Sequence, residues 1–220
     1  NSLSAKGIKD FEKIDLSKDQ KSGRFFEDQP DITDEHQIHF IYLLPSDGED
    51  RELDINGKMQ DILEKANDAM LEATKVNKGS GGEGKKFRYD YREDGKLDVT
   101  FVRMDRKARS GGWNVNYPDY YLTKNGFNNP KKMYLSFTDS ASGDGGQMGP
   151  HHGYIFIGKA GSQYPNIIIN AMLHGLGFAM QDVTPANVDS YLQNAKDATN
   201  MLTGMKKAFV EKQRTDERLA

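Results

Sequence analysis

The sequence contains no cysteine and only five histidines among its 220 residues. Without cysteine, the chain has no disulfide, no thiol nucleophile and no thiolate ligand for a zinc ion or an iron–sulfur cluster. A transition-metal site must therefore combine carboxylates with histidine side chains. The five histidines are His36, His39, His151, His152 and His174.

Long apolar runs and an excess of one charge are also missing. The longest apolar stretches are residues 38–44, interrupted by His39, and residues 167–169, whereas a membrane-spanning helix needs roughly 18 apolar residues. Thirty Lys and Arg residues against 33 Asp and Glu residues give a net charge of −3, so no positive field attracts a phosphate backbone. We therefore expect a soluble protein with no membrane span and no nucleic-acid partner.

The patterning of apolar residues predicts an α/β (α+β) fold. Runs rich in β-branched and aromatic residues predict strands at residues 37–44, 132–138 and 153–157, and a hairpin of strands 87–91 and 97–103. Apolar residues at helical spacing predict a long helix over residues 56–76 and a second helix from residue 165 or 166 to about 180. A surface loop over residues 110–129 is expected to hold a short helix near residues 117–124, and residues 139–152 are expected to form a loop.

At this length we expect one domain. Residues 1–34 are polar and predict an N-terminal arm, residues 35–184 form the main body, and residues 185–220 form a helical C-terminal extension.

The most informative segment is residues 170–180, NAMLHGLGFAM. Zinc peptidases carry H-E-x-x-H on a helix, where two histidines one turn apart bind zinc and the glutamate polarises the zinc-bound water. The extended form H-E-x-x-H-x-x-G-x-x-H adds a turn glycine and a third histidine. In this alignment His174 is the second ligand and Gly177 the turn glycine, whereas Asn170, Ala171 and Met180 replace the first ligand, the general base and the third ligand.

Residues 167–181 resemble the active-site helix of the metzincin metallopeptidases, and residues 173–178, LHGLGF, are most similar to the astacins. The preceding order of strand, long helix and further strands is also similar, so the resemblance covers residues 37–181. It implies a zincin-like mixed, twisted sheet with a long backing helix and a motif helix. It further implies a substrate-pairing edge strand at residues 154–157 and a binding cleft that includes Tyr154, Phe156 and His174.

The substitutions in the motif argue against conventional zinc hydrolysis. Asparagine is a poor zinc ligand, alanine accepts no proton, and a thioether is too soft to replace imidazole at a hydrolytic zinc site. We therefore expect a pseudoenzyme, a catalytically degenerate metallopeptidase-like protein that acts as a secreted binding or structural module and needs no cofactor.

Two alternatives remain open at this stage. One is a hydrolase with a rearranged zinc site, formed by His174, one of His151 and His152, and a carboxylate such as Asp182. The other is an unrelated α/β domain in which residues 167–180 form a buried helix and His174 is a hydrogen-bonded core histidine.

Other candidate sites have simpler interpretations. His151 and His152 are adjacent, so on a strand they point to opposite faces and at most one would join a metal. The loops at residues 139–146 and 47–57 are calcium candidates. The second loop, however, has Leu63 where a calcium-binding loop needs glutamate, so helix capping by Asp54 or Asn56 is the simpler interpretation.

We expect surface or packing roles for His36 and His39. For the aromatic loop with Trp113 and Tyr117–Tyr121, binding a partner and packing on the body are both consistent with the sequence.

The expected partner is a protein or peptide. The polar termini, residues 1–34 and the charged residues 206–217, also suit self-assembly. The first residue is Asn1 rather than methionine, as after removal of a signal peptide, and together with the resemblance this predicts a secreted or periplasmic location.

Overall fold

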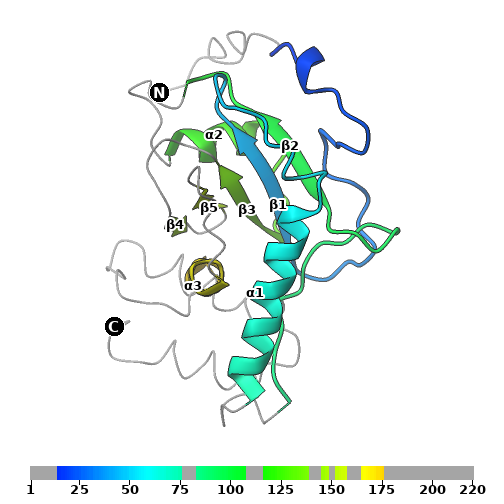
Figure 1. Ribbon diagram of the computed structural model, residues 1–220, viewed down its shortest axis with the longest axis vertical. Helices are drawn as coiled ribbons and strands as arrows, with labels where there is room; N and C mark the ends of the chain where they lie inside the picture. Colours follow the sequence, from blue (N-terminus) through cyan, green and yellow to red (C-terminus); the bar gives the residue numbers. More distant parts are fainter. Residues whose placement is uncertain are drawn as a thin grey trace, which may run out of the picture.

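A five-stranded mixed β-sheet lies at the centre of the computed structural model (Figure 1). The model describes residues 14–75, 83–107, 116–138, 145–148, 152–157 and 165–175. The strands are β1 (Gln37–Leu44), β2 (Val99–Arg103), β3 (Lys132–Thr138), β4 (Gly145–Met148) and β5 (His152–Phe156), in the spatial order β2-β1-β3-β5-β4. Strands β2, β1, β3 and β5 are parallel, and β4 is antiparallel to β5.

Helices cover both faces of the sheet. Helices α1 (Lys58–Lys75) and α3 (Pro165–Gly175) pack on one face, and α2 (Asn116–Lys124) packs on the other. A short 3-10 helix, η2, spans Ser17–Asp19. The predicted α/β (α+β) class, with a mixed sheet and a long helix, is thus confirmed.

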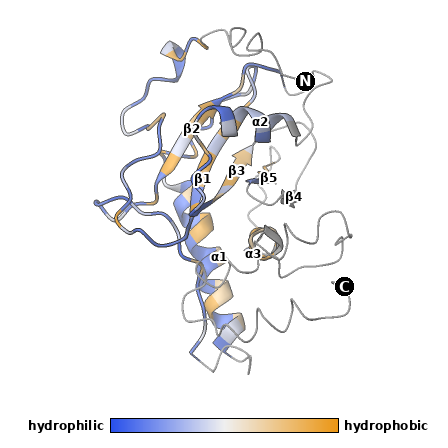
Figure 2. Ribbon diagram, turned by 180° about the vertical axis from the view of Figure 1, so that it is seen from behind, coloured by the Kyte–Doolittle hydropathy of each residue, from blue (hydrophilic) through white to orange (hydrophobic). Residues whose placement is uncertain are grey.

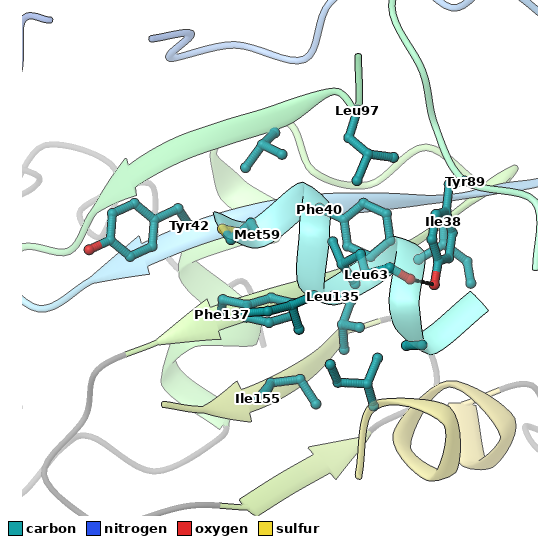
Figure 3. Packing of buried hydrophobic residues seen from close by; sticks show 14 of the residues in the cluster. Ile38, Phe40, Tyr42, Met59, Leu63, Tyr89, Leu97, Leu135, Phe137 and Ile155 are labelled. Atoms are coloured by element: carbon teal, nitrogen blue, oxygen red, sulfur yellow. Dashed lines mark hydrogen bonds between the residues drawn. The ribbon is translucent and has the colours of Figure 1, made fainter. Parts of the chain in front are cut away.

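Strand alternation divides the core into two apolar clusters. Ile38, Phe40 and Tyr42 of β1 point to the α1 face, where they pack near Met59 and Leu63 of that helix (Figure 3). Side chains at the alternate positions of β1 pack with α2. Because the parallel strands are covered on both faces, nearly every residue of β1, β2, β3 and β5 is buried.

Helix α1 follows the predicted periodicity closely. Its buried residues recur at helical spacing, and its charged residues face outward, whereas the polar Asn67 is buried (Figure 2). The Asn56 side chain accepts a hydrogen bond of 3.0 Å from the Lys58 backbone amide, which satisfies one of the free donors at the helix start. Capping by Asn56 is therefore confirmed.

The predicted hairpin is wrong in its first strand. The backbone around Tyr89 bridges Ile38 in parallel, and the Ile38 amide donates to the Arg88 carbonyl. A single antiparallel bridge, between Tyr91 and Leu97, closes the turn around Gly95, which has φ 78°. The chain then enters β2, which pairs with β1 and not with residues 87–91.

Strand β4 was not predicted. It lies inside the segment 139–152, where the sequence predicts only a loop, because Gly145–Met148 reads GGQM and carries no β-branched or aromatic residue. The short helix expected near residues 117–124 is confirmed as α2.

Residues 14–29 lie along the outer side of β2 (Figure 1). The Arg103 guanidinium donates two hydrogen bonds of 2.7 Å to the Asp19 carboxylate. Further along, the Phe101 amide donates to the Phe25 carbonyl at 2.8 Å. This part of the polar N-terminal segment is therefore attached to the sheet by a buried ion pair as well as by backbone pairing.

No helix in the described ranges combines the length and apolar character needed to cross a membrane. The helical C-terminal extension predicted for residues 185–220 lies outside the described residues.

Candidate functional site: the motif helix, the strand edge and a buried charge cluster

Helix α3 carries the first part of the zinc-peptidase-like motif. Asn170 and His174 lie one turn apart and so share a helix face. Ala171, in the position of the general base, is 5% exposed and belongs to the apolar cluster with Ile168 and Met172. Gly177 and Met180 lie outside the described residues.

The structure does not place the predicted cleft residues on one side of the sheet. Tyr154 and Phe156 pack with the α2-face cluster, whereas Ile155 and Ile157 face α1 and α3. The side chains of Tyr154 and Phe156 therefore point away from α3, because successive residues of a strand alternate between the faces.

The predicted edge strand is corrected by the pairing. Strand β5 lies between β3 and β4 and is an interior strand. The outermost strand on this side is β4, Gly145–Met148, which pairs with no other strand in the described parts of the chain. An extended ligand that pairs with the sheet on this side would therefore pair with β4.

The histidines proposed for a rearranged metal site are not brought together by the described residues. His152 is buried on the α2 face, where its Nε2 donates to the Phe127 carbonyl at 3.0 Å and its Nδ1 lies 3.3 Å from Asp119 Oδ1. Its ring stacks on Tyr134 with centroids 5.3 Å apart. Helix α3 is on the opposite face, and His151 lies outside the described residues.

The first calcium candidate, residues 139–146, lies largely outside the described residues. In the second loop, the carboxylates of Asp50 and Asp54 each accept two hydrogen bonds of 2.7–3.0 Å from the Arg24 guanidinium. Since Arg24 is a fixed cation, it supplies the positive charge that a calcium ion would otherwise bring.

Trp113 lies outside the described residues, but Tyr117 and Tyr121 of the aromatic segment pack on the body. The Tyr117 hydroxyl donates to Asp105 at 2.6 Å, and Arg106 lies over the Tyr117 ring at 3.7 Å. Packing therefore accounts for these two aromatic residues.

A charge cluster that no sequence pattern predicted is buried at the amino ends of β1, β2 and β3. Lys132 Nζ lies 2.7 Å from Asp28 Oδ1 and from Asp90 Oδ2, and 2.6 Å from Asp31 Oδ1. His39 Nδ1 donates to Asp90 Oδ2 at 2.9 Å.

A further carboxyl group, that of Asp98, completes the cluster. Asp98 Oδ2 accepts a hydrogen bond of 2.8 Å from the Gln29 amide, and Oδ2 lies 3.8 Å from His39 Nδ1. Asp98 Oδ1 is buried and receives no hydrogen bond from the described residues.

Burial and pairing set the charge states in this cluster. Burial raises the pKa of Asp98 to about 6, although the His39 ring opposes the shift. For Asp90, hydrogen bonds from His39 and Lys132 outweigh the effect of burial and lower the pKa. For Lys132, burial lowers the pKa, but hydrogen bonds to the Asp28, Asp31 and Asp90 carboxylates outweigh it, so the net shift is upward.

We interpret the cluster as an internal ion network. Ligand atoms of Asp28, His39, Asp90 and Asp98 lie within 4.8 Å of one another, a spacing compatible with a divalent cation. The Lys132 ammonium, however, already contacts both Asp28 and Asp90 and fills the cationic role. The packing role predicted for His39 is confirmed by its burial, but its acidic neighbours come from positions far apart in sequence.

No protein-family model matches the chain, and no curated protein matches it. Among solved structures, it is similar to the wild-type protein OgpA from Akkermansia muciniphila, with 16% identity and a TM-score of 0.39 over 82% of this chain and 49% of that one. Catalytically inactive OgpA in complex with an O-glycopeptide (glycodrosocin) substrate matches with 14% identity and a TM-score of 0.38, over 80% and 49% of the two chains. The chain thus spans about half the length of these structures.

Proposed function

We propose that this chain is a metallopeptidase-like domain that has lost zinc hydrolysis and binds an extended peptide or protein segment. The observation that carries the proposal is Ala171. It occupies the position of the general base, its methyl group accepts no proton, and it is buried in the apolar core between α3 and the sheet. A carboxylate that activates water needs contact with the metal-bound water, which a buried core position does not offer.

The ligand position one residue earlier supports the same conclusion. Asn170 replaces the first histidine of the motif, so the α3 helix offers only His174 as an imidazole ligand. A catalytic zinc site uses three protein ligands and an open position for water.

Strand β4 is the proposed docking edge for the ligand. It is the antiparallel outer strand of the sheet, and its far side pairs with no strand in the described residues. An extended segment can add to such an edge through backbone hydrogen bonds. Its sequence, GGQM, leaves the backbone sterically accessible at the two glycines.

Metal analysis combined with a cleavage assay tests the loss of hydrolysis. Protein dialysed against zinc and then against buffer is expected to retain substoichiometric zinc and to cleave no member of a generic fluorogenic peptide library. The His174→Ala variant should retain the same amount of zinc as the wild type. Stoichiometric zinc that is lost in His174→Ala, together with peptide cleavage, would establish the rearranged hydrolase instead.

Peptide binding is tested with a display library of extended peptides. The selected peptide is then compared with a copy that has the same side chains but carries N-methyl groups on alternate backbone nitrogens. If the peptide pairs with β4, methylation of the nitrogens that face the strand lowers the affinity roughly tenfold or more, because two or more backbone hydrogen bonds are lost. A second copy, methylated on the other set of alternate nitrogens, should keep its affinity. Equal affinity of the two methylated copies would rule out strand addition.

A further inference from the structure

A cavity of about 520 Å³ lies on the α2 face of the sheet, beside the buried charge cluster. It falls in the size range of small-molecule sites, roughly 300–1,000 Å³. Three aromatic residues line it, namely Tyr120, Phe127 and Tyr134. Phe127 and Tyr134 meet edge to face with centroids 5.7 Å apart, which fixes two of the aromatic surfaces.

One carboxylate in the cavity is held in a defined orientation. Asp119 Oδ1 accepts a hydrogen bond of 2.7 Å from the Tyr154 hydroxyl and lies 3.3 Å from His152 Nδ1. Burial, reinforced by the Asp119 charge, raises the pKa of Tyr154, so its hydroxyl remains protonated and donates. The Asp119 side chain keeps 40% of its surface exposed, and its contacts with Tyr154 and His152 are both made through Oδ1.

The charges around the cavity favour a cation over an anion. The basic residue in its lining, Lys132, has a side chain only 1% exposed, and three carboxylates surround its Nζ. The adjacent cluster contains four carboxylates against Lys132 and His39, so its net charge is negative even when both are protonated. An anionic ligand would therefore meet the Asp119 carboxylate, whereas the Lys132 ammonium of the lining is already paired with carboxylates.

Aromatic faces add to this preference. Tyr120, at 45% exposure, presents its ring to the solvent, and the Lys124 ammonium lies 5.7 Å from its centroid. This contact shows that the ring already accepts an ammonium group at a distance typical of a cation–π interaction.

We infer that this cavity is a binding site for a small organic cation, a primary ammonium on an apolar stem. The ammonium would pair with Asp119 Oδ2, and the stem would lie between the Tyr120, Phe127 and Tyr134 rings. This site is on the α2 face and is independent of the peptide edge and of the motif helix.

The test uses three probes with one carbon skeleton, namely 4-phenylbutylamine, 4-phenylbutanol and 4-phenylbutyrate. They are titrated by calorimetry at pH 8, where an ordinary histidine is neutral and the amine is charged. The amine is expected to bind at least tenfold more tightly than the alcohol, and the carboxylate more weakly than either. Equal affinities, or no binding of the amine, would overturn the inference.

Two variants locate the site. Asp119→Asn keeps an oxygen acceptor for Tyr154 but removes the charge, and it should abolish the preference for the amine while the melting temperature stays close to that of the wild type. Asp61→Asn, which alters an exposed carboxylate on α1 paired with Lys65, is the matched control and should leave all three affinities unchanged. A preference that survives Asp119→Asn would place the amine elsewhere.

Tyr120→Ala provides an independent check if Asp119→Asn folds poorly, because Tyr120 is exposed and its loss leaves the core intact. The amine affinity should fall roughly threefold through the lost cation–π contact, with a smaller change for the alcohol. An unchanged amine affinity would contradict the proposed arrangement.

Discussion

Asp98 is a carboxyl group in an environment that disfavours its charge. It is 1% exposed, and one of its oxygens has no donor among the described residues. Its folded-state pKa is raised from 3.8 to about 6 by burial. Between about pH 4 and pH 6 the folded chain therefore holds more protons at this site than the unfolded chain does, so this group's contribution to stability declines as the pH rises through that window.

Asp98→Asn should remove this pH dependence while keeping an oxygen to accept the Gln29 amide. Relative to the wild type, we expect the free energy of unfolding of the variant to increase by roughly 2–3 kcal/mol between pH 4 and pH 7, the value of a two-unit pKa shift. Urea unfolding followed by circular dichroism at several pH values measures it.

Asp94→Asn is the control for this experiment. The Lys96 backbone amide and Arg92 lower the pKa of Asp94, so its stabilising contribution is present above the unfolded pKa and is lost as the pH falls. The pH dependence of this variant should have the opposite sign. A shared sign for the two variants would contradict the assigned environment of Asp98.

Helix α3 packs Ala171 into the core, and this burial has a measurable consequence. Ala171→Glu would bury a carboxylate among apolar side chains such as Ile168 and Met172. We expect a loss of roughly 3 kcal/mol or more in the free energy of unfolding, because an uncompensated buried charge is strongly destabilising.

Ala73→Glu makes the same change at an exposed position of α1 and should alter stability by no more than about 0.5 kcal/mol. Thermal unfolding of the two variants gives the comparison. If Ala171→Glu were as well tolerated as Ala73→Glu, the general-base position would be open to solvent, which would contradict the proposed loss of the catalytic centre.

The elements differ in how well the sequence predicted them. Strands β1, β3 and β5 and helix α1 follow from their own residues, because each has a strong apolar pattern over its length. Strand β4 forms because β5 lies beside it, and its residues Gly145 and Gly146 carry no such pattern. The pairing partner of residues 87–91 likewise depends on where β1 lies.

The charge cluster was not predictable for a related reason. Lys132 and His39 each lie in an apolar strand, where a single polar residue has many possible partners. Their partners Asp28, Asp90 and Asp98 come from three separate segments. Only the strand order and register bring these residues together, and neither is encoded in local spacing.

At the scale of the whole molecule, Arg24 connects the N-terminal segment to the loop before α1. Its side chain is fully buried and contacts Asp50 and Asp54. Arg24→Gln would leave these two carboxylates without their cation, and we expect roughly 3–5 kcal/mol of destabilisation together with faster chymotrypsin cleavage near Phe25 and Phe26.

Lys21→Gln is the matched control, since Lys21 forms a partly exposed pair with Glu52. It should leave the free energy of unfolding close to that of the wild type, because exposed ion pairs contribute little, and it should leave the cleavage rate unchanged. Equal protease resistance of wild type and Arg24→Gln would show that the backbone pairing of residues 14–29, and not the buried ion pair, holds the segment in place.

The two sides of the sheet are unequal. Residues 14–29 lie along β2, whereas β4 has no strand beyond it in the described residues. Because residues 14–29 shield the β2 edge, a strand that added to the described sheet would add beside β4, and stacking of sheets through both edges is disfavoured.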